Sequence, residues 1–301
     1  YETGHFAQLW YGIAKRLGLD AQLLPSDWRH PVDPVAIGEA LAKDVDHRIK
    51  AVCVVHNETS TGAMSDVAAV RAVIDETRHS ALLMVDTISS LASIDFRHDE
   101  WGVDVTVGGS QKGLMLPPGL GFNAVSDKAL AASLDATLPR AYWNWQDILD
   151  ANNNGFFPYT PATNLLYGLR EALSMLLDEG LENVFERHRR LAEATRCAVA
   201  AWQLELLCLD SAARSHSLTA VQLPEGADAD AFRATVLERF NMSLGNGLGR
   251  LSGRVFRIGH LGDFNDLMLI CTPGGVEMGL AASGIAHQRG VVTAAMDYLS
   301  G

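Results

Sequence analysis

The sequence has few lysines, no long apolar run and almost no clustering of basic residues. Only five of its 301 residues are lysine, and the formal net charge is -12. A membrane helix needs roughly 18 to 20 apolar residues, and the apolar stretch LLYGLREALSMLL is interrupted by Arg170 and Glu171. Nucleic-acid phosphates are bound by concentrated Lys and Arg, and the single basic run is RHRR at 187–190. We therefore expect neither a membrane protein nor a partner of nucleic acid.

Cysteine is also scarce and lacks the spacing of a metal site. Cys53, Cys197, Cys208 and Cys271 include no CxxC pair, and the ten histidines include no HExxH motif. We expect Cys208 and Cys271 to pack as small hydrophobic groups in strand-like surroundings. The sequence thus predicts a cytoplasmic protein without a metal ion.

The chain starts at Tyr1, without a methionine or an apolar signal segment, and we expect its N-terminal part to be missing. Its length suits about two domains. We place the boundary near Gly180, after the helical pattern at 162–179. Residues 1–180 then form a large, N-terminally truncated domain that binds the cofactor, and residues 181–301 form a connecting helix and a smaller domain.

Three apolar runs that end in polar turns predict a parallel sheet. Residues 50–55 precede HNETSTG, residues 82–85 precede DTISS, and residues 103–107 precede GGSQK. The segment at 66–79 places valines and Ile74 at helical spacing between the first two runs. Apolar strands that alternate with helices are typical of an α/β fold, in which ligands bind beyond the carboxyl ends of the strands. The three turns should converge on one crevice.

Lys112 is the lysine expected in this crevice, because the other four lie on helices or before a strand. Burial at a strand end lowers the pKa of an amine and makes it nucleophilic. Asp86 follows the neighbouring strand. A lysine that forms a Schiff base and an acid that keeps a pyridine nitrogen protonated are what pyridoxal phosphate requires. The pair, with Thr59 and Gln111 in the turns, predicts this cofactor. The alternatives are a solvated loop lysine and an aspartate that caps a turn.

Several longer motifs occur in order between Gly4 and about Gly279: ETGHFA, VVHNETSTG, LLMVDTISS, GSQKGLMLPPGLGF, FPYTPATNLLYGLREAL and FRIGHLGDFNDLM. Together they resemble the class V aminotransferases of fold type I, especially the serine–glyoxylate and alanine–glyoxylate aminotransferases. The resemblance implies a mainly parallel sheet sandwiched by helices, a smaller C-terminal α/β domain, and a homodimer with shared active sites. It also implies transfer of an amino group from L-serine, or a similar small amino acid, to glyoxylate, giving glycine and a 2-oxo acid.

The resemblance also assigns roles to individual residues. Lys112 would form the internal aldimine with pyridoxal phosphate and later carry the proton, and Asp86 would pair with the pyridinium nitrogen. Ile88 would pack on one face of the cofactor ring. Thr59 would lie near the ring hydroxyl and Gln111 near the phosphate. Thr160 would reach the phosphate of the neighbouring subunit. A stacking aromatic residue and a glycine-rich phosphate turn, usual in the family, would precede Tyr1.

Arg257, on a short predicted strand, is the expected ligand of the substrate carboxylate. The residue alone is equally compatible with an outward-facing arginine on an edge strand, and the resemblance favours the inward position, where a guanidinium grips a carboxylate with two hydrogen bonds. The amino donor stays open among serine, alanine and aspartate. A lyase or aldolase that uses a lysine Schiff base, a pyridoxal-phosphate lyase on the same fold, and a non-catalytic truncated fragment are the remaining alternatives.

Overall fold

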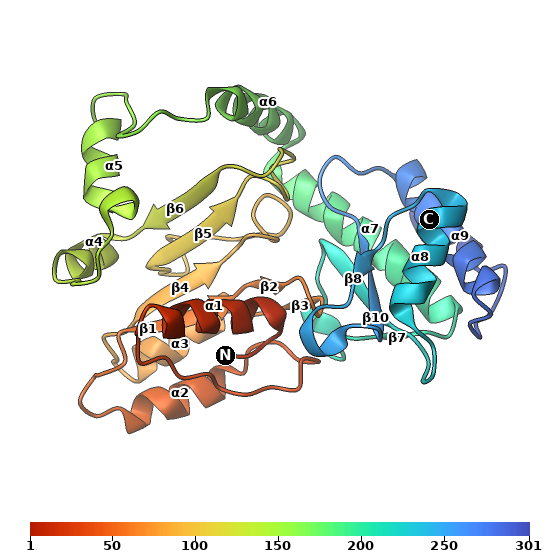
Figure 1. Ribbon diagram of the computed structural model, residues 1–301, viewed down its shortest axis with the longest axis horizontal. Helices are drawn as coiled ribbons and strands as arrows, with labels where there is room; N and C mark the ends of the chain where they lie inside the picture. The colour runs from red at the N-terminus through yellow and green to blue at the C-terminus, as the bar shows by residue number, and fades with distance from the viewer.

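The computed structural model describes all 301 residues, and two four-stranded sheets divide them into two halves (Figure 1). The first sheet has the order β1-β4-β5-β6. Its strands are β1 (Ala51–Val55), β4 (Leu82–Asp86), β5 (Val105–Gly109) and β6 (Gly121–Val125). The first three are parallel, and β6 runs antiparallel to β5. A short hairpin, β2 (Asn57–Glu58) with β3 (Ala63–Met64), follows β1. The parallel arrangement predicted from the three apolar runs is confirmed.

Six helices and a short 3-10 turn accompany the first sheet: α1 (His5–Arg16), α2 (Pro34–Lys43), α3 (Val67–Glu76), α4 (Asp127–Leu134), η1 (Ala141–Trp143), α5 (Trp145–Asn152) and α6 (Thr163–Glu179). Helix α3 is the one that the spacing at 66–79 predicts. It begins after Asp66, whose side chain accepts a hydrogen bond from the Ala69 amide, as an N-cap does. Its buried face, Val67, Val70 and Ile74, packs in one apolar cluster with Leu83 and the rest of that core.

The second half begins at Gly180, whose φ of 84° suits a residue without a side chain between two helices. Helix α7 (Leu181–Ala201) leads into an antiparallel sheet of order β7-β8-β10-β9. Its strands are β7 (Glu205–Leu206), β8 (Leu218–Gln222), β9 (Gly245–Asn246) and β10 (Val255–Gly259). The remaining elements are η2 (Ser211–Ala213), α8 (Ala229–Phe240), η3 (Gly249–Leu251), α9 (Asp266–Ala282) and α10 (Val292–Ser300).

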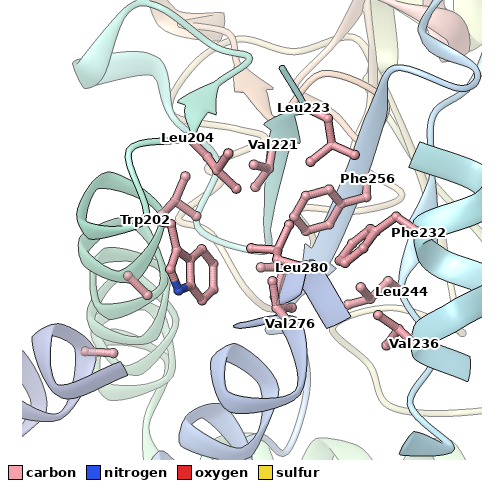
Figure 2. Packing of buried hydrophobic residues seen from close by; sticks show 14 of the residues in the cluster. Trp202, Leu204, Val221, Leu223, Phe232, Val236, Leu244, Phe256, Val276 and Leu280 are labelled. Atoms are coloured by element: carbon pink, nitrogen blue, oxygen red, sulfur yellow. The ribbon is translucent and has the colours of Figure 1, made fainter. Parts of the chain in front are cut away.

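The core of the second half lies between its sheet and helices α7 to α9 (Figure 2). Trp202, Phe232 and Phe256 are fully buried, and the rings of Phe232 and Phe256 lie 4.9 Å apart at 59°. The Trp202 indole donates a hydrogen bond of 3.0 Å to Glu277 Oε2. Each such side chain contributes about 1.5 to 3 kcal/mol by leaving water. The core therefore fixes β10, which carries Arg257, against its helices.

One local expectation is wrong: Cys271 lies on α9 and is exposed, whereas Cys208 is buried as expected. A short apolar run such as LMLIC has no period that separates a strand from a helix. The predicted boundary near Gly180 falls at the junction of α6 and α7. No helix of the protein combines the length and the apolar character needed to cross a membrane.

Candidate active site

The carboxyl ends of β1, β4 and β5 lie side by side. Val55 on β1 is paired with Asp86 on β4, and Asp86 is paired with Val107 on β5. Parallel strands place their carboxyl ends at the same edge of a sheet. The turn that carries Thr59, the residue Asp86 and the turn that carries Lys112 therefore meet at one edge.

Asp86 is a half-buried carboxylate with an unused acceptor. Its Oδ1 accepts a hydrogen bond of 2.8 Å from the Ile88 amide, and the carboxylate makes no ion pair within the chain. Burial raises its pKa to about 6, and the Glu58 charge adds to the increase. A cation placed against the second oxygen of Asp86 would therefore stabilise the ionised form of this carboxylate.

Lys112 follows β5 in a loop whose backbone is tightly held. The Ser110 hydroxyl donates to the Pro117 carbonyl at 2.8 Å and accepts from the Leu120 amide at 3.2 Å. A Cβ at Gly113 would lie 2.1 Å from the Leu91 carbonyl oxygen, so only glycine fits directly after the lysine. The ammonium itself has no acidic partner. Burial, and then the Arg257 charge, lowers the Lys112 pKa.

Arg257 reaches from β10 to the large sheet. Its Nε donates to the Asn246 carbonyl and its Nη1 to the Thr59 carbonyl, both at 2.8 Å. It is partly buried and has no carboxylate partner in the chain, and burial lowers its pKa. Because the guanidinium bonds to the Thr59 backbone, Arg257 points inward, as expected, and not to solvent from an edge strand.

A buried set of hydroxyl and amide groups holds the turn after β1. The Thr59 hydroxyl donates to Ser89 Oγ at 2.7 Å, and the Asn57 amide donates to Ser89 Oγ at 2.8 Å and to Ser217 Oγ at 2.9 Å. Ser217 precedes β8, so these bonds link the two halves of the molecule directly beside Thr59. Ser89 and Ser217 were not anticipated from the sequence, because both lie in ordinary polar turns.

Ile88 and Gln111 come together above Gly109. A Cβ at Gly109 would lie 3.0 Å from Ile88 Cδ1 and 3.0 Å from Gln111 Oε1. Gln111 is exposed, and its side chain makes no hydrogen bond in the chain. An apolar group and a free amide are thus placed at the end of β5, which lies three residues before Lys112.

Thr160, which is predicted to reach the neighbouring subunit, and His56, in the turn after β1, lie away from the other site residues of the chain. Thr160 lies on the exposed connection between α5 and α6 and makes no hydrogen bond with the other site residues within one chain. The His56 ring is buried, bonds to Ser90 Oγ at 2.9 Å, and lines a separate cavity of about 790 Å³ with residues such as Trp101 and His216. Burial lowers the His56 pKa to about 4. Successive residues of an extended chain point to opposite faces, which explains why His56 and Asn57 diverge.

Comparisons with known proteins agree with this geometry. The family model for class V aminotransferases ("Aminotransferase class-V") matches residues 1–248. The serine–glyoxylate aminotransferase of Methylorubrum extorquens is 49% identical over 98% of this chain and 75% of its own length. The chain belongs to the class V aminotransferases. The L-aspartate–glyoxylate aminotransferase of Paracoccus denitrificans is 44% identical over 97% of this chain and 74% of its own.

A solved structure supports the same fold. The crystal structure of ureidoglycine–glyoxylate aminotransferase from Bacillus subtilis superimposes with a TM-score of 0.91 at 28% identity, over 99% of this chain and 77% of that one. The expected α/β architecture of fold type I, a mostly parallel sheet with helices and a second smaller sheet, is therefore confirmed. The protein is a pyridoxal-phosphate-dependent aminotransferase by family.

The donor set of this aminotransferase fits pyridoxal phosphate. The cofactor has an aldehyde, a basic ring nitrogen and a phosphate. The site offers an amine, Lys112, with a lowered pKa, a half-buried carboxylate, Asp86, with a free oxygen, and Gln111 with a free amide. Neither Lys112 nor Asp86 forms an ion pair within the chain, and the Gln111 side chain makes no hydrogen bond there. Each of them is left available for a group of the cofactor.

Glu58 is a buried group of the aminotransferase that the sequence did not single out. Its Oε1 accepts from the Ser60 hydroxyl at 2.6 Å and the Phe6 amide at 3.3 Å, and its Oε2 accepts from the Ala7 amide at 3.2 Å. The carboxylate therefore caps α1, which has no side-chain cap of its own at Gly4. The partner lies more than fifty residues away in sequence, so no local signal could reveal it.

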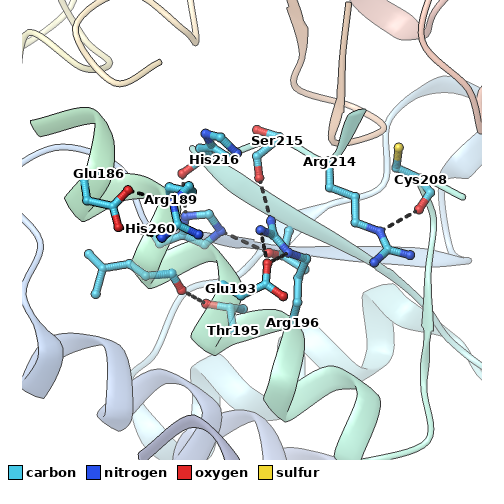
Figure 3. A network of polar contacts seen from close by, with 12 residues as sticks. Glu186, Arg189, Glu193, Thr195, Arg196, Cys208, Arg214, Ser215, His216 and His260 are labelled. Carbon is cyan, nitrogen blue, oxygen red and sulfur yellow. Dashed lines mark hydrogen bonds and ion pairs between the residues drawn. The ribbon is translucent and has the colours of Figure 1, made fainter. Parts of the chain in front are cut away.

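A second polar network lies beside α7 and does not take part in the proposed chemistry (Figure 3). Arg196 pairs with Glu193 and donates to the Ser215 carbonyl at 3.1 Å, while His260 Nδ1 donates to the His216 carbonyl at 3.0 Å. Burial, and then the Arg196 charge, lowers the pKa of His216 to about 4 and of His260 to about 3. Both rings are neutral near pH 7, and the His260 ring holds the loop before β8 through its bond to the His216 carbonyl.

Proposed function

We propose that the aminotransferase binds pyridoxal phosphate through Lys112 and transfers the amino group of L-serine, or of a similar small amino acid, to glyoxylate. The products are glycine and a 2-oxo acid. One observation carries the proposal: Asp86, Lys112 and Arg257 converge from two sheets, and none of them forms an ion pair within the chain. The names of the relatives from Methylorubrum and Paracoccus support glyoxylate as the acceptor.

The cofactor, when bound, supplies an electron-accepting ring that makes the proton on the substrate α-carbon acidic. Asp86 would hold its negative charge against the pyridine nitrogen, and Ile88 would cover one ring face. The Thr59 hydroxyl, which donates to Ser89, keeps acceptor capacity for the ring hydroxyl. The Gln111 amide would donate to the phosphate. The roles of Asp86, Thr59 and Gln111 follow from the hydrogen-bonding capacity that each leaves unused, and the role of Ile88 follows from its apolar surface. The family pattern supports all four.

Lys112 would act as the proton carrier. Its lowered pKa increases the fraction of neutral amine, and a neutral Nζ can take the proton from the substrate α-carbon. Arg257 would bind the substrate carboxylate through N–H groups that Thr59 and Asn246 leave free. Fixing the carboxylate fixes which bond of the α-carbon faces the ring, and this orientation favours loss of the proton.

We also propose a homodimer in which Thr160 binds the phosphate held by the neighbouring subunit. Its hydroxyl is exposed and free of hydrogen bonds in the chain. Large apolar side chains around it are exposed as well, as is typical of an association surface. They include Tyr142 (60% exposed), Trp143 (77%) and Phe156 (70%). The four unpaired cysteines suit a reducing compartment, and the proposal places the enzyme in the cytoplasm.

A donor panel tests the reaction. The protein is loaded with pyridoxal phosphate, followed by its visible absorbance, and serine, alanine and aspartate are compared as donors to glyoxylate. Serine should give the highest kcat/KM. A preference for aspartate would indicate instead the aspartate–glyoxylate transamination for which the Paracoccus relative is named. Breakdown of the amino acid without conversion of glyoxylate to glycine would contradict transamination and favour a lyase, while failure to bind the cofactor would favour a non-catalytic fragment.

Mixing two variants tests the shared site. Lys112→Ala homodimers should be inactive and Thr160→Ala homodimers should bind the cofactor weakly. In a mixed dimer, one site has both Lys112 and Thr160, so mixing after subunit exchange should restore part of the activity. A strictly additive mixture, or a monomer by light scattering at the assay concentration, would contradict the shared site.

A further inference from the structure

We infer that Gly245 determines the position of the Arg257 guanidinium, and through it the affinity of the site for carboxylate substrates. This role of Gly245 rests on the proposed function, in which Arg257 binds the substrate carboxylate. The three atoms nearest to a Cβ built on Gly245 all belong to Arg257. Gly245 is therefore a positioning residue, which acts through the arginine.

The register of the small sheet places the two residues opposite each other. Strands β9 and β10 are antiparallel, and Gly245 is paired directly with Arg257. Side chains of residues that are directly opposite point to the same face of a sheet. At position 245 that face is occupied by the arginine stem, which lies over the glycine.

The space above Gly245 is already filled by Arg257. A Cβ built on Gly245 would lie 3.1 Å from Arg257 Cβ and 3.3 Å from Arg257 Nε. Both distances are shorter than ordinary contact between a methyl group and its neighbours. The φ angle of Gly245 is not in the left-handed region, so alanine can adopt this backbone and the conflict is with Arg257 alone.

The guanidinium has little freedom to give way. Nε donates to the Asn246 carbonyl and Nη1 to the Thr59 carbonyl, each at 2.8 Å. The first acceptor is on β9 and the second is in the turn after β1, so the arginine is held between two elements that belong to different sheets. A shift of Nε away from a methyl group at position 245 lengthens its hydrogen bond to the Asn246 carbonyl. A movement of β9 away from β10 has the same effect.

Nη2 is the part of the guanidinium left for a ligand. It makes no hydrogen bond in the chain, and Arg257 has no acidic partner within 4 Å. A guanidinium binds a carboxylate most strongly when two parallel N–H groups match its two oxygens. A displacement of the guanidinium by a few tenths of an ångström therefore weakens carboxylate binding and leaves cofactor binding, which involves Lys112 and Asp86, unchanged.

Gly245→Ala and Gly259→Ala form a matched pair for the test. Gly259 ends the same strand as Arg257, and a Cβ there would meet nothing within 4 Å. The probe is glycolate, an unreactive carboxylate of the size of glyoxylate, titrated by calorimetry into each protein loaded with pyridoxal phosphate. We expect Gly245→Ala to weaken glycolate binding about tenfold and raise KM for glyoxylate similarly, as for one strained charge-assisted hydrogen bond. Cofactor affinity should stay the same, and Gly259→Ala should match the parent chain.

Arg257→Gln distinguishes the carboxylate-binding role proposed for Arg257 from the positioning role inferred for Gly245. If Gly245 acts through Arg257, adding Gly245→Ala to Arg257→Gln should weaken glycolate binding no further. Unchanged glycolate affinity in Arg257→Gln would overturn the carboxylate role proposed for the arginine. Weak binding in Arg257→Gln with parent-like binding in Gly245→Ala would overturn only the inference about Gly245.

Folding of each variant is checked by circular dichroism and thermal unfolding. If Gly245→Ala does not fold, the clash with Nε predicts that the double variant with Arg257→Ala, which removes Nε and every side-chain atom beyond Cβ, recovers part of the lost stability. A double variant that is no more stable than Gly245→Ala alone would contradict the inference. Equal losses of cofactor and glycolate affinity in Gly245→Ala would contradict it too, because they would indicate general damage to the site.

Discussion

The large and the small sheet contribute groups of different kinds to the candidate site. Asp86 and Lys112, at the ends of parallel strands, have pKa values that burial moves toward neutrality, and neither has a charged partner. Arg257, on the antiparallel sheet, stays charged and is fixed by two carbonyl groups. In the proposed reaction the large sheet would therefore control protonation, and the small sheet would control the orientation of the substrate. Chemistry that moves a proton needs the first, and selection of the bond to be broken needs the second.

The largest effect should come from Lys112. Lys112→Ala should abolish the visible absorbance of the lysine-linked cofactor and all transamination, because no other amine lies at this edge of the large sheet. Lys50→Ala is the control, since the Lys50 ammonium donates to the His47 carbonyl on the surface. The measurement is borohydride reduction of the loaded protein followed by peptide mapping. A pyridoxyl group on Lys50 or Lys128 would contradict the assignment.

Asp86→Asn should have the next largest effect on the reaction. The neutral amide keeps the bond from the Ile88 amide but cannot balance a positive ring nitrogen. Loss of one charge-assisted hydrogen bond, worth about 1.5 to 3 kcal/mol, should slow the proton transfer roughly tenfold to hundredfold. Single-turnover kinetics with serine measure the step. Turnover equal to that of the parent chain would show that the large sheet does not control protonation through Asp86.

The same variant should have the opposite effect on the cofactor-free protein. Burial raises the Asp86 pKa from its ordinary value near 3.8 to about 6, so the folded state binds more protons than the unfolded chain between these values. Stability therefore falls as the pH rises through this window. Asp86→Asn should stabilise the apoprotein by about 2 to 3 kcal/mol at pH 7, and the gain should disappear below about pH 4.

Urea unfolding of the apoprotein at pH 4 and pH 7 measures this difference. The control is Asp99→Asn, because Asp99 is exposed and its carboxylate makes no hydrogen bond. A gain that is equal at both pH values would contradict the burial of an ionised Asp86. A gain in Asp99→Asn as well would point to the net charge of the chain and not to Asp86.

The smallest effect is expected for Glu58, which holds α1 beside the turn of Thr59. Glu58→Gln removes the charge that caps the helix and should lower the free energy of unfolding by about 1 to 3 kcal/mol. Thermal unfolding measures it, with the exposed Glu238→Gln as the control. Weaker glycolate binding in Glu58→Gln, beyond the loss of stability, would show that the turn also transmits strain to Arg257.

The fold was largely predictable, because its signals are local. The strands at 50–55 and 82–85, the helix at 66–79 and the long helices on either side of Gly180 follow from apolar period and turn residues. The position of Cys271 was predicted wrongly, because a short apolar run without a period fits either a helix or a strand. The contact of Glu58 with α1 joins distant segments, and the contact of Gly245 with Arg257 depends on the register of β9 against β10, so no local pattern contains either.

The sequence by itself determined that Asp86 and Lys112 end neighbouring strands, because parallel strands bring their carboxyl ends to one edge wherever the helices between them are placed. It also determined the family. Only the tertiary structure decided which atoms of each group are free. Burial, and not residue type, raises the pKa of Asp86, and the Thr59 and Asn246 carbonyls leave Nη2 of Arg257 open. The physical reason is that desolvation and hydrogen bonding depend on the distances between atoms far apart in the chain, and folding alone sets those distances.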